Sequence, residues 1–112
     1  MVGSNKPYIT MVKKILADGS ACQKCIDVQQ RLETSGFIDL INEVVEAYET
    51  DPFSPGMIKA AELGVTQAPF FIVEDPNEGT QVYTVYFKLV QEVLKPRRKQ
   101  LEEDPRGYIP KL

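Results

Sequence analysis

The chain has 112 residues, of which 43% are hydrophobic and 26% are charged, as expected for a single globular domain with one core. The formal net charge of −3 gives no basic face for nucleic acid, and no apolar run approaches the roughly 18 residues needed to cross a bilayer. We therefore expect neither a nucleic-acid nor a membrane partner. The N-terminal sequence MVGSNKPYIT lacks the basic-then-apolar pattern of a secretion signal, which predicts a cytoplasmic protein.

The sequence contains no histidine, and this excludes several kinds of site. Neither a Ser-His-Asp triad nor a Cys-His nucleophile can be assembled, and an HExxH zinc site is equally excluded. A closed structural zinc site needs four Cys or His ligands, whereas the chain has two cysteines. Zinc or an iron–sulfur cluster would therefore need ligands from a second subunit or from carboxylates.

The first third of the chain predicts a strand followed by a helix. Tyr8 to Leu16 is mostly apolar and β-branched, interrupted by Lys13 and Lys14, which is typical of a strand. The turn residues Asp18 to Ser20 end it, and a helix then fits from Cys22 to about Ser35. The spacing i, i+3 and i+7 predicts that one side of this helix carries Cys25, Val28 and Leu32.

The middle of the chain predicts a second strand and a second helix. Val44 to Tyr48 has the composition of a short strand. Ser54 followed by Pro55 is a typical helix start, with the serine as the cap and the proline in the first turn. The small and apolar residues that follow are spaced so that they lie on one side of this helix. They are Met57, Ala60, Ala61 and Gly64.

The last third predicts a hairpin and a final helix. Ala68 to Val73 is an apolar run of strand length, and the turn residues Asp75 to Gly79 connect it to a partner strand over Thr80 to Thr84. The overall order is then β-α-β-α-β-β-α. The final helix is expected to end near Pro96, and its apolar positions are Tyr86, Leu89, Val90 and Val93.

The composition changes after this helix. We expect one domain over residues 1–95, followed over residues 96–112 by a charged tail or a short terminal helix. An alternative role for this segment is a docking patch for an acidic partner, made of Lys95, Arg97, Arg98 and Lys99.

Both cysteines lie in the sequence DGSACQKCIDV, as a Cys-x-x-Cys pair. Because the first N–H groups of a helix are unpaired and its dipole is positive there, the pKa of a thiol at Cys22 should be lowered. Cys25, one turn later, can close a small disulfide ring with it. This predicts Cys22 as the attacking thiol and Cys25 as the resolving thiol, with Lys24 as a candidate for tuning the pKa. Half of a metal site and a pair of small core residues are the alternatives.

The order of elements and the segment LGVTQAPFFIV resemble the thioredoxin-like superfamily over roughly residues 8–95. In that family a segment G-[VI]-x-x-x-P leads into the next strand, and Gly64, Val65 and Pro69 match it position by position. The resemblance implies an α/β, thioredoxin-like fold, with a mixed four-stranded sheet flanked by about three helices. It also implies a cis bond before Pro69, with Ala68 presenting its backbone to an extended substrate and Gln67 as a polar neighbour of the ligand.

The chain departs from both thioredoxins and glutaredoxins. Tryptophan is absent, Gln23 and Lys24 stand between the cysteines, and the last helix begins with TVYF in place of a glycine-rich, acid-containing signature. We therefore expect weak glutathione binding, and a dithiol or a reductase as the electron donor.

The predicted function is that of a thiol–disulfide oxidoreductase without a cofactor beyond its own redox-active disulfide. Its partner would be a protein disulfide or a reductive enzyme, such as a sulfate-assimilation type reductase. Two alternatives stay open, a non-catalytic binding module on the same scaffold and a zinc or iron–sulfur site shared across a dimer.

Overall fold

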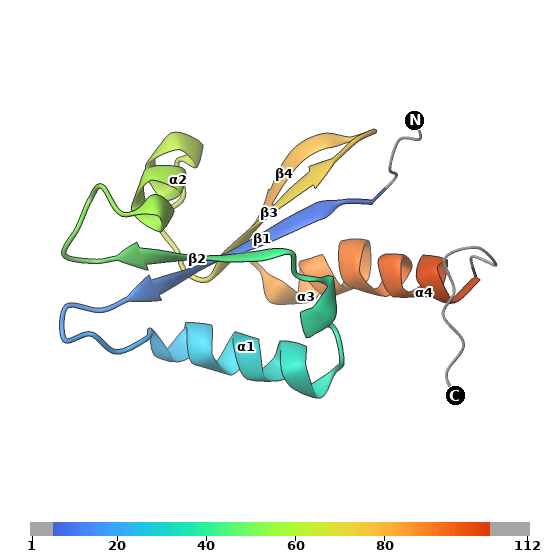
Figure 1. Ribbon diagram of the computed structural model, residues 1–112, viewed down its shortest axis with the longest axis horizontal. Coiled ribbons are helices and arrows are strands. Elements are labelled where there is room, and N and C mark those ends of the chain that lie inside the picture. The colour runs from blue at the N-terminus through green and yellow to red at the C-terminus, as the bar shows by residue number, and fades with distance from the viewer. Residues whose placement is uncertain (1–5, 104–112) are drawn as a thin grey trace.

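A computed structural model describes residues 6–103 and places a four-stranded sheet at the centre of the molecule (Figure 1). The strand order is β2-β1-β3-β4, with β1 parallel to β2 and antiparallel to β3, and with β3 antiparallel to β4. The strands are β1 (Tyr8–Ile15), β2 (Glu43–Tyr48), β3 (Phe70–Asp75) and β4 (Gly79–Tyr83). The predicted α/β class, mixed sheet and order β-α-β-α-β-β-α are confirmed at this level.

One face of the sheet is covered by α1 (Gln23–Thr34) and by the C-terminal helix. The buried stripe of α1 consists of Cys25, Val28 and Leu32, as its spacing predicted. The larger hydrophobic cluster of the protein joins this stripe to β1, β3 and β4, and its members are Ile9, Met11, Val28, Leu32, Phe71, Val73, Tyr83, Leu89 and Leu94. A short 3-10 helix, η1 (Ile38–Leu40), follows α1 and packs against the same cluster.

The other face carries α2 (Pro55–Leu63), which packs against a smaller cluster of Val12, Ala47, Phe70 and Ile72. The predicted start of α2 at Ser54 and Pro55 is confirmed, but Ser54 makes no side-chain cap bond to the helix. Its hydroxyl, which is buried, instead donates to the carbonyl of Asp51 at 2.7 Å and accepts from the N–H of Tyr48 at 2.9 Å. Ser54 therefore fixes the loop after β2, because its hydroxyl is used there and not on α2.

The C-terminal helix does not end near Pro96, and this prediction was wrong. It runs through α3 (Tyr86–Leu89), the π-helical turn η2 (Val90–Leu94) and α4 (Lys95–Glu103). Within η2 the N–H of Lys95 donates to the carbonyl of Val90, five residues earlier. This wider turn comes directly before Pro96, whose missing N–H and bulky ring would disrupt an ordinary α-turn. Residues 104–112 of the expected tail lie outside the described residues.

The π-helical turn also changes which residues of this helix face the core. A regular helical period predicted Val93 among the apolar positions of this helix, with Tyr86, Leu89 and Val90, and did not include Leu94. In the structure Leu94 is fully buried and Val93 only partly so, because the extra residue in the turn shifts the inner face by one position.

Candidate functional site

The Cys-x-x-Cys pair lies at the start of α1, as predicted. Cys22 is the N-cap residue, with φ −58° and ψ 138°, and α1 begins at the next residue. The N–H of Cys22 donates to the carbonyl of Lys14 at 3.0 Å, and its own carbonyl accepts from the N–H of Ile26 at 3.0 Å. Cys22 is therefore held between the end of β1 and the first turn of the helix.

The backbone of Lys14 contacts both cysteines. Its carbonyl accepts from Cys22, and its N–H donates to the Sγ atom of Cys25 at 3.4 Å. The pairing of β1 with β3 ends where Val12 lies opposite Phe70, so the last residues of β1 leave this edge to the cysteine loop. The two cysteines therefore lie beside the part of β1 that extends beyond its pairing with β3.

The same register locates the segment before β3. Pro69 and Ala68 come directly before Phe70, which pairs with Val12, and Val12 lies two residues before the Lys14 that bonds both cysteines. The Ala68–Pro69 peptide bond is cis, as the resemblance implied, and Pro69 is buried. Gln67 is exposed and Ala68 is half-buried, so exposure falls along this segment toward Pro69.

The half-buried thiol of Cys22 has a lowered pKa. Burial alone would raise this pKa, but several groups that stabilise the thiolate outweigh it. The backbone N–H and the thiol of Cys25 donate to the sulfur, the backbone N–H of Lys24 does so too, and the charge of Lys14 attracts it. These are the free N–H groups of a helix start, which favour an anion.

The thiol of Cys25 behaves in the opposite way. Only 1% of Cys25 is exposed, and burial raises the pKa of its thiol to about 11, with a further rise from the nearby Cys22 sulfur. The N–H of Lys14 and the charge of Lys13 act against this rise without cancelling it. The two sulfurs thus differ: Cys22 is accessible and ionises more readily than an ordinary thiol, and Cys25 is shielded and ionises less readily.

The cation that lowers the pKa of Cys22 comes from β1. Sequence reasoning named Lys24 as the tuning candidate, but Lys24 contributes through its backbone N–H, and the attracting charge belongs to Lys14. The signal that could have revealed this role is the pair of lysines that interrupts the apolar pattern of β1. A charged residue at the end of an otherwise buried strand has to face a polar neighbour or solvent.

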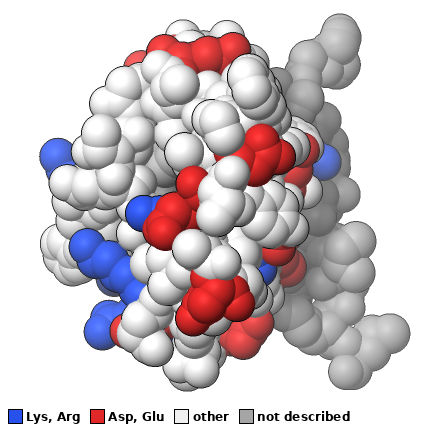
Figure 2. Space-filling model, turned by 90° about the vertical axis from the view of Figure 1, so that its left-hand side faces the viewer, with Lys and Arg blue, Asp and Glu red and all other residues white. Residues whose placement is uncertain are grey.

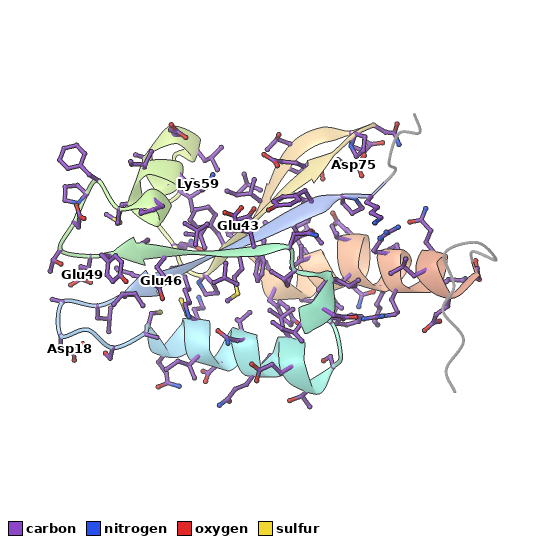
Figure 3. All side chains as sticks on the ribbon, viewed as in Figure 1. Asp18, Glu43, Glu46, Glu49, Lys59 and Asp75 are labelled. Atoms are coloured by element: carbon purple, nitrogen blue, oxygen red, sulfur yellow. The ribbon has the colours of Figure 1, made fainter. Side chains whose placement is uncertain are left out.

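The two lysines of β1 also have acidic partners on and just after β2. Lys13 lies 3.9 Å from a carboxylate oxygen of Glu46, and Lys14 lies 3.5 Å from one of Glu49. Glu46 and Glu49 lie at the end of the molecule that also carries Asp18 (Figure 3). Acidic and basic groups are mixed on this end, and much of it is uncharged (Figure 2). The cations near the cysteines are therefore partly neutralised, not gathered into a basic patch.

The loop before the cysteines is shaped by Asp18. Its carboxylate oxygen accepts from the backbone N–H of Ser20 at 2.9 Å and from the Ser20 hydroxyl at 2.6 Å. The bond from the Ser20 hydroxyl is the main cause of a lowered pKa at Asp18. Asp18 is therefore a turn residue that leads into the cysteines.

The aromatic residues near the last helix do not share one role. Tyr83 belongs to the core, and its hydroxyl donates to Glu92 at 3.0 Å. Tyr86 is half-buried, with its ring centroid 6.3 Å from that of Phe71. Phe87 is 68% exposed. Of these three aromatic residues only Phe87 offers a largely exposed ring on the surface.

Compared with models of protein families, with curated proteins and with solved structures, the chain has no match. Within residues 6–103, no group of three or more cysteine and carboxylate side chains is placed to hold a metal ion. No helix in this described part of the chain combines the length and the apolar character needed to span a membrane.

Proposed function

We propose that the protein is a thiol–disulfide oxidoreductase of the thioredoxin-like type, with Cys22 as the attacking and Cys25 as the resolving thiol. The observation that carries this proposal is the contrast between the two sulfurs. Cys22 has a lowered pKa and access to solvent, whereas Cys25 is shielded, with a pKa of about 11. A thiolate is the nucleophile in disulfide exchange, so this contrast favours attack by Cys22.

In the first step the Cys22 thiolate attacks one sulfur of a substrate disulfide. The substrate S–S bond breaks, a bond between the Cys22 sulfur and the attacked sulfur forms, and the other substrate sulfur leaves as a thiolate that takes up a proton. The N–H groups at the start of α1 and the charge of Lys14 favour this step, since both stabilise the reactive form of Cys22.

In the second step Cys25 attacks the sulfur of Cys22. Once Cys22 is in the mixed disulfide it carries no negative charge, so one cause of the high pKa of Cys25 is removed. The N–H of Lys14 and the charge of Lys13 then help Cys25 to lose its proton. The second substrate thiol leaves, and the Cys22–Cys25 disulfide forms. Two electrons and two protons have then passed to the substrate, and an external dithiol restores the pair.

The arrangement around the pair supports the family part of this proposal. The four-stranded mixed sheet, the helix that begins at the cysteines and the segment before β3 agree with what the resemblance to thioredoxin-like proteins implies. The partner is proposed to be a protein disulfide or a reductive enzyme, and the donor a dithiol or a reductase.

The proposal is tested by the reduction of insulin with dithiothreitol, followed as turbidity. The wild-type protein should accelerate the reaction above dithiothreitol alone, and Cys22→Ser should remove the acceleration. Cys25→Ser should instead accumulate a mixed disulfide that mass spectrometry detects, because attack still occurs and resolution cannot. Thr50→Ala, at an exposed position of the loop after β2, is the control and should act as the wild type does.

Two results would contradict this function. No acceleration by the wild-type protein would exclude disulfide reduction. Faster alkylation of Cys25 than of Cys22 by iodoacetamide at neutral pH would reverse the roles of the two thiols.

A further inference from the structure

A groove lies between α1 and the C-terminal helix, on the same face of the sheet, with a cavity volume of about 570 Å³. Both helices lie together on one side of the sheet in Figure 1. The α1 side of the groove is a stripe at helical spacing, namely Lys24, Asp27, Val28, Arg31 and Ser35. Neither cysteine lines the groove, but Lys24, which stands between them in the sequence, does, so the groove runs along α1 from its first turn.

The charges of the groove differ from those of the protein as a whole. The protein has a formal charge of −3, but the groove contains Lys24, Arg31 and Lys95 against the single acid Asp27. Within residues 6–103 none of these three cations has an ion pair, whereas Lys13, Lys14 and Arg98 each have one. The carboxylate of Asp27 already accepts a hydrogen bond from Gln23 at 2.9 Å. The groove therefore has an excess of positive charge, three cations against one acid, and none of the three is held in an ion pair with a described residue.

The groove also contains apolar surface and one polar atom without a partner. Val28, Phe37 and Val90 contribute apolar side chains, and the 68% exposed ring of Phe87 stands at its edge. The hydroxyl of Tyr86, which lines the groove, is buried and has no hydrogen-bond partner among the described residues. A buried hydroxyl left unpaired is costly. Because this oxygen is closed to solvent, it belongs to the wall of the groove, and the surface open to a ligand is the charged and apolar lining.

We propose that this groove docks an acidic segment of the protein whose disulfide Cys22 attacks, with an apolar side chain of that segment seated against Phe87. The proposal rests on the proposed function and adds the chemistry of the partner. Three unpaired cations favour carboxylates, and an exposed aromatic ring beside partly buried apolar residues is typical of an interface anchor. A nucleic acid fits less well, because it needs a broader basic face than three cations on an acidic protein provide.

Binding is tested first without any thiol chemistry. The probe is a fluorescein-labelled peptide of Glu and Asp residues around one Phe and one Leu, and the protein is the Cys22→Ser/Cys25→Ser variant. Fluorescence anisotropy should show saturable binding that weakens as salt is added. The same peptide with Ser in place of each acid should not bind.

Charge reversals then locate the site. Lys24→Glu with Arg31→Glu should weaken binding by about tenfold or more, because two favourable charges become repulsive. The matched control, Lys88→Glu with Lys99→Glu, reverses two exposed cations of the C-terminal helix that do not line the groove, and it should change binding by less than about twofold. Phe87→Ser should weaken binding by about fivefold or more without a change in charge. Circular dichroism verifies that each variant is folded.

Three results would overturn the docking site: an equal loss in the control pair, no effect of Phe87→Ser, or tighter binding of a single-stranded oligonucleotide than of the acidic peptide. An equal loss in the control pair would mean that binding depends on the overall charge of the protein and not on the groove. No effect of Phe87→Ser would remove the apolar anchor, and tighter binding of the oligonucleotide would assign the groove to nucleic acid.

The link to disulfide exchange is tested separately in the wild-type protein. The acidic and serine peptides each carry one cysteine as a mixed disulfide with a coloured thiol, whose release is followed by absorbance. The acidic peptide should react faster, and Arg31→Glu should remove most of the difference. If the peptide binds but neither disulfide is attacked, the proposed function fails while the docking surface stands. If both peptides react equally fast, the function stands and the groove is not where the partner docks.

Discussion

The two faces of the sheet hold their helices in different ways. On one face α1 and the C-terminal helix bury large side chains, including Leu32, Leu89 and Leu94, in the larger cluster. On the other face α2 buries mainly Gly56, and its apolar residues Met57 and Ala60 are only partly covered. The cysteine helix is thus positioned by extensive side-chain packing, and α2 by a close approach of backbones. The fixed position of Cys25 follows from the first arrangement.

The largest change in the free energy of unfolding is expected at the buried side of α1, the helix that begins at the cysteines. Leu32→Ala should lower the free energy of unfolding by about 2–5 kcal/mol, because Leu32 is fully buried and its removal leaves a cavity. The matched change on the other face is Leu63→Ala, at a position of α2 that is 39% exposed, and it should cost less than about 1 kcal/mol. Urea unfolding followed by circular dichroism measures both. Equal losses would remove the proposed difference between the faces.

On the α2 face the sensitive position is a glycine. A Cβ atom at Gly56 would lie 2.6 Å from the backbone nitrogen of Ala47 and 2.7 Å from its Cα and Cβ atoms. Gly56→Ala should therefore destabilise the protein by about 1–3 kcal/mol, although alanine favours helices over glycine. Adding Ala47→Gly should not restore stability, because two of the three close atoms belong to the backbone. Full rescue by that second change would show that α2 is not held by a backbone contact.

The packing of α1 and of α2 also shows what could be predicted from the sequence. The buried stripe of α1 was predictable because its apolar residues repeat at helical spacing, and the start of α2 because Ser54 and Pro55 carry local backbone preferences. The close approach at Gly56 was not predictable, since it depends on where β2 passes beneath the helix. Likewise, the contacts of Lys14 with both cysteines arise from two segments that meet only in the folded sheet.

The course of the last helix exposes a second limit of such reasoning. A proline after an amphipathic segment usually predicts its end, and Pro96 was interpreted in this way. The helix continues because the turn before Pro96 widens into a π-helical turn, and no local pattern in Val90 to Leu94 predicts this widening. The candidate cysteine site was predictable because helix starts favour thiolates wherever they occur. The two lysines of β1 pointed to a cation, but the choice of Lys14 depends on how β1 meets the cysteine loop in the folded sheet.

A moderate effect is expected at Ser54, on the α2 face. Ser54→Ala removes the acceptor for the N–H of Tyr48 and the donor to the carbonyl of Asp51, two part-buried hydrogen bonds of a serine that is itself buried. We expect a loss of about 1–2 kcal/mol in the free energy of unfolding, in the range for buried polar groups left without a partner. Thr50→Ala, in the same loop but exposed, should change it by less than about 0.5 kcal/mol. If the two variants lose equal stability, the hydroxyl of Ser54 does not hold the loop.

The smallest effect is the pH dependence that the two thiols give to the α1 face, measured with both cysteines reduced. Because folding raises the pKa of Cys25 from 9.0 to about 11, its contribution to stability is complete below pH 9 and is lost as the pH rises toward 11. Folding lowers the pKa of Cys22, so its contribution has the opposite sign and is present above its unfolded pKa of about 9. The raised pKa values of Tyr83 and Tyr86 add a further loss above pH 10, so the informative window lies near pH 9 to 10.

The two thiols partly offset each other, so the net change across this window should stay below about 1.4 kcal/mol, the equivalent of one pKa unit. Urea unfolding at several pH values separates the two contributions. Cys25→Ala should flatten the fall in stability above pH 9, since the thiol that resists ionisation in the folded protein is gone. Cys22→Ala should remove the increase in the free energy of unfolding that occurs as the pH rises toward 9, and it should keep the decrease above pH 9. If Cys25→Ala leaves the fall unchanged while Cys22→Ala removes it, the shielded thiol is Cys22, and the assignment of attacking and resolving sulfurs has to be exchanged.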